Sequence, residues 1–356
     1  MARAVALLAA LGDRIAMALP GDDSVAAFEA VAAEGFVLER RGLDSESAAG
    51  ADQVAAGCTA VGLDDVLAHA DRETRPFAGA LGGRAHGYTW NAEDGRTKDW
   101  WPQGITGSAD AHGSGRVAGR EVHAVSWYSK RGQGVRLSFV DVAAGRYRHV
   151  LCVRTTGGQA FAPVKVHAGG IAWVENLMYV ADTRHGLRVF DTDRVLRVPE
   201  TLRGAAHGYA HVMPQVGAYL STGGALSFSF VSLDRSGSAA LVVGEYEKAP
   251  GGRLVRWPID LSSGLLASER ATGAYRAPVD RLQGAASVAD HVVASSSRRG
   301  GRLYVGRGRE RSARHVWWPY LPEDLHLSTA AGELYSVTEA PGMRMVFGVR
   351  TAALGL

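Results

Sequence analysis

The sequence contains few cysteines and no long apolar run. Cys58 and Cys152 are the only cysteines in 356 residues, too few for a fold held together by a framework of disulfides. No run of about eighteen apolar residues occurs, so we expect no membrane-spanning helix. The formal net charge is only +3, and so small an excess does not demand a polyanionic partner. These absences predict a protein without a nucleic-acid or membrane partner.

Several short motifs of common enzyme classes are also missing. The sequence contains no G-x-S-x-G, H-E-x-x-H or C-x-x-C motif and no P-loop. The serine-esterase, zinc-protease and nucleotide-binding interpretations therefore have no support.

The N-terminal stretch MARAVALLAALGDRIAMALPG has some features of a signal sequence. Asp13 and Arg14 interrupt its apolar run, and the stretch is more typical of an amphipathic helix. We therefore expect a cytoplasmic protein, with a secreted protein as the alternative.

Two regions differ in composition. Residues 1–80 are rich in alanine and predict short helices at 2–18, 22–33, 48–57 and 62–71. From residue 85 to residue 356, short runs of aromatic and β-branched residues alternate with polar residues between glycine-, aspartate- and serine-containing turns. No long helical segments separate these runs, which argues against a parallel α/β sheet. We expect a small helical N-terminal region, 1–80, and an all-β domain, 85–356.

Five segments of the all-β region begin alike. Each places a polar residue just before a small or apolar strand, and the steps between these residues run from 40 to 68 positions. The leading residues are Gln103, His167, Gln215, Gln283 and Glu323. Such steps suit four-stranded propeller blades with hairpin insertions of variable length. The sequence therefore predicts a five-bladed β-propeller, or a six-bladed one if part of 36–80 is strand.

A propeller must close its ring. The last repeat has room for only three strands, at 325–330, 333–338 and 344–349, and HGYTW at 86–90 is the candidate for the fourth. A blade that mixes early and late strands locks the ring and removes exposed strand edges.

The tripeptide Trp-Trp-Pro occurs twice, at 100–102 and at 317–319. Both copies precede a predicted inner strand, so we interpret them as one structural element used twice. Trp101 and Trp318 are candidates for stacking on a sugar or an aromatic ligand. The alternative is that the indoles pack between blades.

The segment HAGGIAWVENLMYVADTRHGLRVFDTDRV, from His167, resembles a blade of the NHL and gluconolactonase-like propellers. Residues 100–350 also resemble a family of bacterial propeller-like proteins, often described only as secreted, and this resemblance implies no activity. Gluconolactonase-like enzymes hold a divalent metal, usually calcium, at the channel mouth with Glu, Asn and Asp side chains. The equivalent positions here are mostly Gln, with Glu323 and Asp324 as the only acids.

The leading residues of the inner strands should surround the mouth of the central channel. Gln103, Gln215 and Gln283 would orient an oxygen-rich substrate through their amides, unless they only satisfy backbone groups of neighbouring blades. His167 is the best candidate for proton transfer, and Glu323 and Asp324 are the carboxylates that would tune it. In strict alternation His326 faces away from Glu323.

Further binding residues are expected in His207-Gly-Tyr-Ala-His211. An extended conformation places His207, Tyr209 and His211 on one face, and we expect Tyr209 and His211 to contact substrate. A zinc site there would need ligands that the sequence does not identify. Calcium held by Glu323 and Asp324 is the one metal site we consider, and otherwise no cofactor is expected.

The sequence thus predicts an enzyme that uses the channel of a propeller for non-redox acid/base chemistry of the hydrolase, lyase or cyclase type. The alternative is a non-catalytic module that binds a glycan or a protein, because propellers serve both purposes. We expect a small-molecule substrate and a monomer or a homodimer.

Overall fold

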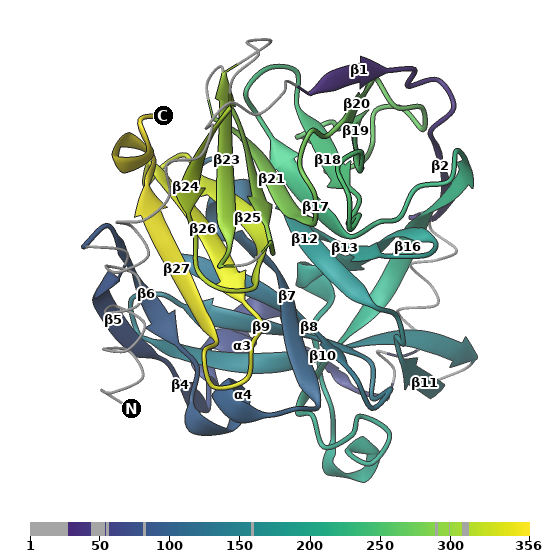
Figure 1. The fold of residues 1–356 in the computed structure, drawn as a ribbon. Helices are drawn as coiled ribbons and strands as arrows, with labels where there is room; N and C mark the ends of the chain where they lie inside the picture. Colours follow the sequence, from purple (N-terminus) through teal and green to yellow (C-terminus); the bar gives the residue numbers. More distant parts are fainter. Residues whose placement is uncertain are drawn as a thin grey trace.

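The computed structural model of the protein consists mainly of β-strands (Figure 1). It describes residues 28–43, 54, 57–80, 83–157, 160–288, 291–298, 300–307 and 313–356. None of the helices in these ranges is long and apolar enough to cross a membrane. These helices are α3 (Gly62–Ala68), α4 (Ala92–Arg96), α5 (Ser108–Ala111) and the 3-10 turns Thr192–Arg194, Glu200–Leu202 and Thr351–Leu354.

Most of the described strands form five antiparallel sets. The first set contains β7 (Trp100–Gly107), β8 (Val122–Ser129), β9 (Val135–Asp141) and β10 (Arg146–Gly157). The second contains β12 (Ala168–Val174), β13 (Leu177–Asp182), β14 (Gly186–Asp191) and β16 (His211–Gly223). The third contains β17 (Phe230–Asp234), β18 (Ala240–Gly244), β19 (Arg253–Pro258) and β20 (Gly273–Arg276).

The last two sets complete the circuit of the chain. The fourth contains β21 (Leu282–Val288), β22 (His291–Ser296), β23 (Arg302–Arg307) and β24 (Ala313–Trp317). The fifth contains β25 (Pro322–Ser328), β26 (Glu333–Thr338), β27 (Met345–Arg350), β6 (Ala85–Thr89) and β5 (Arg75–Ala80).

Shorter strands extend the edges of these sets. They are β1 (Glu29–Val31) on β20, β2 (Val37–Gly42) on β16, and both β4 (Arg72–Glu73) and β11 (Ala160–Pro163) on β10. β15 (Leu196–Arg197) pairs with β16 on one side and with β3 (Thr59–Ala60) on the other.

The first strand of each set lies at a common axis. β7, β12, β17, β21 and β25 contact one another in that cyclic order, and β25 contacts β7. The buried apolar clusters lie between neighbouring sets, so each set packs its two faces against the sets before and after it. This arrangement is a β-propeller, as the sequence predicts. The number of blades stays a prediction, because the first two sets share one continuous sheet through parallel pairing of β10 with β16.

The inner strands approach one another closely where they carry glycine. A Cβ atom at Gly170 of β12 would lie 2.6 Å from Asp324 Oδ2 and 2.7 Å from the backbone nitrogen of Val231. A Cβ atom at Gly284 of β21 would lie 2.6 Å from the backbone nitrogen of Leu325. Real Cβ atoms are not found at such distances, so the small residues of the repeats let the backbones meet at the axis.

The carboxylate of Asp324 fills the space between these strands. Its Oδ2 atom accepts the backbone N–H of Ile171 at 2.9 Å and that of Ile105 at 3.3 Å, and its Oδ1 atom accepts the N–H of Leu325 at 3.0 Å. The side chain is fully buried. Burial raises the pKa of Asp324 well above its ordinary value, and the three N–H groups oppose that shift. Asp324 therefore joins β25 to β7 and β12.

The ring closes as the sequence predicts. β27, near the C-terminus, pairs antiparallel with β6, and Figure 1 shows the yellow C-terminal strands beside the blue β5 and β6. The segment proposed for closure, 86–90, includes most of β6. β5 then covers the outer edge of this set. Closure removes an exposed strand edge and ties the two ends of the propeller sequence together.

The N-terminal region differs from its prediction. The expected helix 2–18 and most of 48–57 lie outside the described residues. The helix expected at 22–33 is wrong in its described part, where Glu29–Val31 form β1, whereas α3 confirms the helix at 62–71. Residues 37–42 and 75–80 lie outside the four predicted helices and form strands that pair with β16 and β6, so part of 36–80 is strand, the condition attached to the six-bladed alternative.

Replacing Gly170 by alanine should test how tightly the axis is packed. The added methyl group would collide with Asp324 and with the backbone of β17, so Gly170→Ala should lower the free energy of unfolding by about 2–3 kcal/mol. Gly237→Ala is the matched control, because nothing lies within 4 Å of its Cβ position, and its effect should stay within about 0.5 kcal/mol. Urea unfolding followed by circular dichroism measures the free energy of unfolding of both variants. Equal losses in Gly170→Ala and Gly237→Ala would contradict the close approach of the inner strands at Gly170.

Candidate functional site

The starts of the inner strands bring polar side chains together at one end of the axis. At the start of β21, Gln283 Nε2 donates to Glu323 Oε1 at 3.2 Å. On β7, Gln103 Nε2 donates to Glu339 Oε2 at 2.8 Å, just beyond the end of β26. We call the whole group the axial mouth cluster, and it consists of Gln103, Tyr128, Lys130, His167, Gln283, Glu323 and Glu339.

The pKa values of the two carboxyl groups of the axial mouth cluster are both raised. Glu323 is only 3% exposed, and burial, then Glu339 and Asp324, raise its pKa well above the ordinary value. Burial also raises the pKa of Glu339, but the hydrogen bond from Gln103 opposes that shift. Glu323 accepts a longer hydrogen bond, from Gln283, whereas Lys130 and Arg344 also lower the pKa of Glu339, so Glu323 is the stronger candidate for a general acid.

His167 joins the cluster through Tyr128, whose hydroxyl is influenced by both carboxyl groups. The ring of His167 meets the ring of Tyr128 edge-on with centroids 4.3 Å apart, and burial, then Glu339 and Glu323, raise the pKa of Tyr128 to about 12. Thr183 Oγ1 donates to the backbone carbonyl of His167 and lies 3.0 Å from His167 Nδ1. Because the hydroxyl proton of Thr183 is directed to that carbonyl, its oxygen can only accept a hydrogen bond from Nδ1. Neutral His167 therefore carries its proton on Nδ1 and its lone pair on Nε2.

The protonation state of His167 suits a base. Burial, followed by the charge of Lys130, lowers the pKa of His167, and Asp182 opposes the shift. The ammonium group of Lys130 lies 3.1 Å from the ring centroid of Trp101, a cation–π contact. The axial mouth cluster therefore combines a buried carboxyl group whose pKa is raised, an imidazole whose pKa is lowered and two amides, which are the groups needed for acid/base chemistry.

Asp324 does not share the surroundings of Glu323. Both of its oxygens accept backbone N–H groups, whose positive ends would repel a cation. In the part of the chain that the structure describes, no group of three or more His, Cys, Asp or Glu side chains is placed to hold a metal ion. The pair Glu323 and Asp324 therefore does not fit the ligand set that calcium requires. Further along β25, His326 Nδ1 contacts Asp110 Oδ2 at 2.9 Å, away from Glu323.

Two of the predicted binding residues lie elsewhere. Gln215 lies on β16, the last strand of the second set, and the inner strand of the next set is β17. Its alignment with the leading residues is therefore wrong. Trp318 is fully buried and packs against Phe347 with ring centroids 4.9 Å apart, so it packs in the core and is not a stacking platform. Trp101 is half-buried under Lys130 at the mouth.

His211 and Tyr209 lie at the rim of the first two sets. Arg148 Nε donates to His211 Nδ1 at 2.9 Å, and His211 Nε2 in turn contacts Asp65 Oδ2 at 2.8 Å. The hydroxyl of Tyr209 accepts from Arg136 at 3.2 Å. These contacts place both residues away from the axis and beside a second polar centre.

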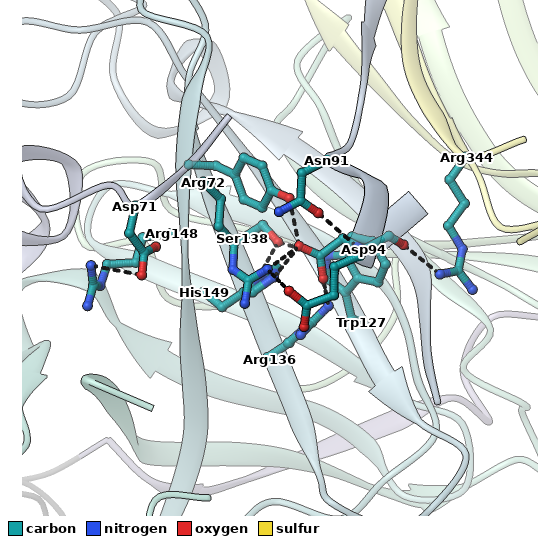
Figure 2. Close-up of polar contacts among 12 residues, drawn as sticks. Asp71, Arg72, Asn91, Asp94, Trp127, Arg136, Ser138, Arg148, His149 and Arg344 are labelled. Carbon is teal, nitrogen blue, oxygen red and sulfur yellow. Dashed lines mark hydrogen bonds and ion pairs between the residues drawn. The ribbon is translucent and has the colours of Figure 1, made fainter. Parts of the chain in front are cut away.

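The second polar centre is built around Asp94 of α4 (Figure 2). Its carboxylate accepts hydrogen bonds from Arg136 at 2.7 Å, Tyr147 at 2.6 Å, His149 Nε2 at 3.0 Å and Arg72 at 3.1 Å. Burial alone would raise the pKa of Asp94, but His149, Arg136 and Arg72 lower it far below its ordinary value. Four donors saturate this carboxylate, so Asp94 holds α4 on the propeller and is not available as a base.

The contacts of His149 have the composition of a catalytic triad. Its Nε2 atom faces Asp94, and its Nδ1 atom lies 2.8 Å from Ser138 Oγ. Ser138 is fully buried, however, and its oxygen accepts the indole N–H of Trp127 at 2.8 Å. A serine sealed in this way cannot attack a substrate, so this chain of hydrogen bonds is structural.

Sequence reasoning missed this centre and also Glu339, Tyr128 and Lys130. One signal for the Asp94 centre was present: Arg136 and Ser138 alternate on β9, and Tyr147 and His149 alternate on β10, so each pair points to one face. Glu339 had no such signal, because it follows a strand and reaches the axis only through the turn between β26 and β27.

No protein-family model matches the chain, and no curated protein does. Solved propeller structures are similar to it. Glutaminyl cyclase from Myxococcus xanthus is 10% identical, with 78% of this chain and 96% of that chain covered and a TM-score of 0.40. The Cps50 (Swd1) β-propeller domain from Myceliophteria thermophila is 11% identical, with 71% and 98% covered and a TM-score of 0.36.

BamB from Moraxella catarrhalis is 12% identical, with 66% of this chain and 57% of that chain covered and a TM-score of 0.29. The chain thus spans little more than half the length of BamB. At these identities the similarity concerns the fold alone. The likeness of one blade to NHL and gluconolactonase-like proteins finds no family match.

His149 should make the stability of the protein depend on pH. Burial, followed by Arg136, lowers the pKa of His149 from 6.5 to about 4. His149 takes up a proton near pH 6.5 in the unfolded chain and only near pH 4 in the folded chain. The contribution of neutral His149 to the free energy of unfolding is therefore complete above pH 6.5 and is lost as the pH falls toward 4. Between pH 7 and pH 4.5 the wild type should lose about 2.5 kcal/mol more than His149→Gln.

Urea unfolding at the two pH values measures this difference. Titrating groups that do not contact His149 contribute equally to both proteins and cancel in the comparison. Asp94 keeps Arg136 and Arg72 beside it in the variant, and these hold its pKa low. An identical pH dependence in both proteins would show that His149 is not held neutral by its surroundings.

Proposed function

We propose that the axial mouth cluster is the active site of an enzyme that performs non-redox acid/base chemistry on a small oxygenated molecule. The observation that carries the proposal is the buried carboxyl group of Glu323. It has a second carboxyl group, Glu339, nearby and no buried cation bonded to it among the described residues. Such surroundings raise the pKa of a carboxyl group and so favour its protonated form, which is costly for a structural role and useful for a general acid.

In this proposal each group has a separate role. Glu323 donates a proton to the departing oxygen of the substrate, and Nε2 of His167 accepts one from the attacking group. The amides of Gln103 and Gln283 hydrogen-bond to Glu339 and Glu323 and hold these carboxyl groups in position. Every step uses side chains of this chain alone.

The proton balance of these roles suits three reactions. In hydrolysis the attacking group is water, in cyclisation it is a second group of the same substrate, and in elimination His167 takes a proton from carbon. In each reaction one proton passes to His167 and one leaves Glu323, so the site regenerates when the two protons exchange with solvent. The hydrolase, lyase and cyclase classes therefore share one arrangement of groups.

A non-catalytic module that binds a glycan or a protein is the alternative. Such a module needs an exposed aromatic or apolar face. Among the described residues the single large hydrophobic side chain that is exposed is Tyr320. The structure of the described surface thus favours the enzyme over the binding module.

Two substitutions test the enzyme. Purified protein is incubated with a small-molecule extract and with panels of esters, lactones and glycosides, and products are followed by mass spectrometry. Glu323→Gln and His167→Asn should each lower kcat by about 100-fold or more, because each removes a proton-transfer group. In the wild type, activity should fall as the pH rises through the raised pKa of Glu323.

Glu200→Gln is the matched control, since its side chain is 89% exposed and lies outside the axial mouth cluster. Its kcat should equal that of the wild type. Full activity in folded Glu323→Gln would overturn the proposal. If the wild type converts nothing but retains a compound from the extract, and Glu323→Gln retains it equally, the binding module is the correct function.

A further inference from the structure

A separate polar cleft opens beside the Asp94 centre, away from the axial mouth cluster. Its volume is about 440 Å³, and it lies between the first set of strands, α4 and the segment that leads into β16. Four arginines line it, and we call it the arginine cleft after them: Arg72, Arg136, Arg148 and Arg203. Tyr209, His149 and Asp94 also face it.

Positive and negative charges lie at different depths in the arginine cleft. The side chains of Asp94 and Arg136 are 2% and 5% exposed, and those of Arg148 and Arg72 are 16% and 26% exposed. The floor therefore holds three guanidinium groups and one carboxylate. His149 adds no positive charge, because its pKa is lowered to about 4.

The other carboxylates of the arginine cleft lie at its rim. The side chains of Asp71 and Glu93 are 58% and 74% exposed, so solvent and salt screen their charge. Asp99 is bound 2.7 Å from the exposed Arg131. The rim therefore does not compensate the positive charge of the floor.

A fourth buried guanidinium group adds to this excess. Arg344 donates to the backbone carbonyl of Asp94 at 2.8 Å, behind the floor of the arginine cleft (Figure 2). Burial, followed by repulsion from Arg136, lowers the pKa of Arg344 to about 10. Arg136 Nε and Arg344 Nη2 are also buried without an acceptor among the described residues. Asp94 and Glu339 offset part of this charge, but several buried guanidinium groups share these two carboxylates, and an anion bound in the cleft would offset the remainder.

The positive groups are also rigid. The guanidinium group of Arg136 lies 4.5 Å from the ring centroid of Trp100 and 4.8 Å from that of Trp127. Its two terminal nitrogens donate to Asp94 and Tyr209. A guanidinium group held in this way loses little entropy when an anion binds beside it.

We propose that the arginine cleft binds a small molecule through an oxyanion group, a carboxylate or a phosphate. Planar guanidinium groups bind the oxygens of both through charge-assisted hydrogen bonds. Arg203 lies nearest to solvent, with its side chain 32% exposed, Arg148 donates from the floor, and the floor as a whole provides the attractive field. This site is independent of the proposed chemistry at the axis.

Titration calorimetry with inorganic phosphate and with malonate tests the proposal, with sodium chloride holding the ionic strength constant. The wild type should bind at least one of them with saturation at one site per chain. Arg148→Gln should weaken the Kd by about tenfold, because it removes a charged donor. Asp71→Asn should strengthen binding, because it removes the carboxylate that lies 3.4 Å from Arg148. A purely structural role of these residues predicts no such opposite effects.

Two further variants serve as controls. Arg41→Gln, whose side chain is 60% exposed and pairs with Glu39, should bind as the wild type does. Glu323→Gln should also bind normally, which separates this site from the axial mouth cluster. Binding of phosphate alone or of malonate alone supports the proposal and identifies the anion. Absence of saturable binding to the wild type, an unchanged Kd in Asp71→Asn, or loss of binding in Glu323→Gln would overturn it.

Discussion

Three backbone N–H groups that converge on the carboxylate of Asp324 determine the geometry at the axis. They come from β7, β12 and β25 itself, and they require these strands to approach within hydrogen-bonding distance of one side chain. Glycine on the inner strands makes that approach possible. The axis is therefore closed at Asp324, and the polar side chains that begin each inner strand gather at its mouth.

The surroundings of three carboxyl groups explain their different properties. Asp94 has two arginines and a histidine beside it and stays ionised. Asp324 has only N–H dipoles, and Glu323 has an amide and a second carboxyl group, so burial raises the pKa of both. Arg344 joins the two regions physically, because it donates to the backbone of Asp94 and, at 2.8 Å, to the backbone of Glu339. A structural centre thus supports the segment that carries one of the proposed active-site groups.

Much of the fold was predictable because strand patterns and repeats are local. The closure of the ring through 86–90 followed from counting strands in the last repeat, and β6 occupies that position. Gln215 was misplaced because β16 begins with the same residue pattern as an inner strand, although it pairs with β14 at the outside of its set. The strands in 37–42 and 75–80 were missed because their pairing partners, β16 and β6, are not apparent from their own composition.

The sequence by itself determined the propeller class and the closure of the ring, and it placed Gln283 and Glu323 on neighbouring inner strands, because alternation, turns and repeats are properties of short segments. Only the tertiary structure decided that Asp324 is tied to the backbone, that Trp318 is core and that Glu339 joins the axial mouth cluster. It alone also placed Asp94 among four donors. Each of these outcomes depends on which distant segment lies within about 3 Å of a side chain, and that distance is set by packing of the whole ring.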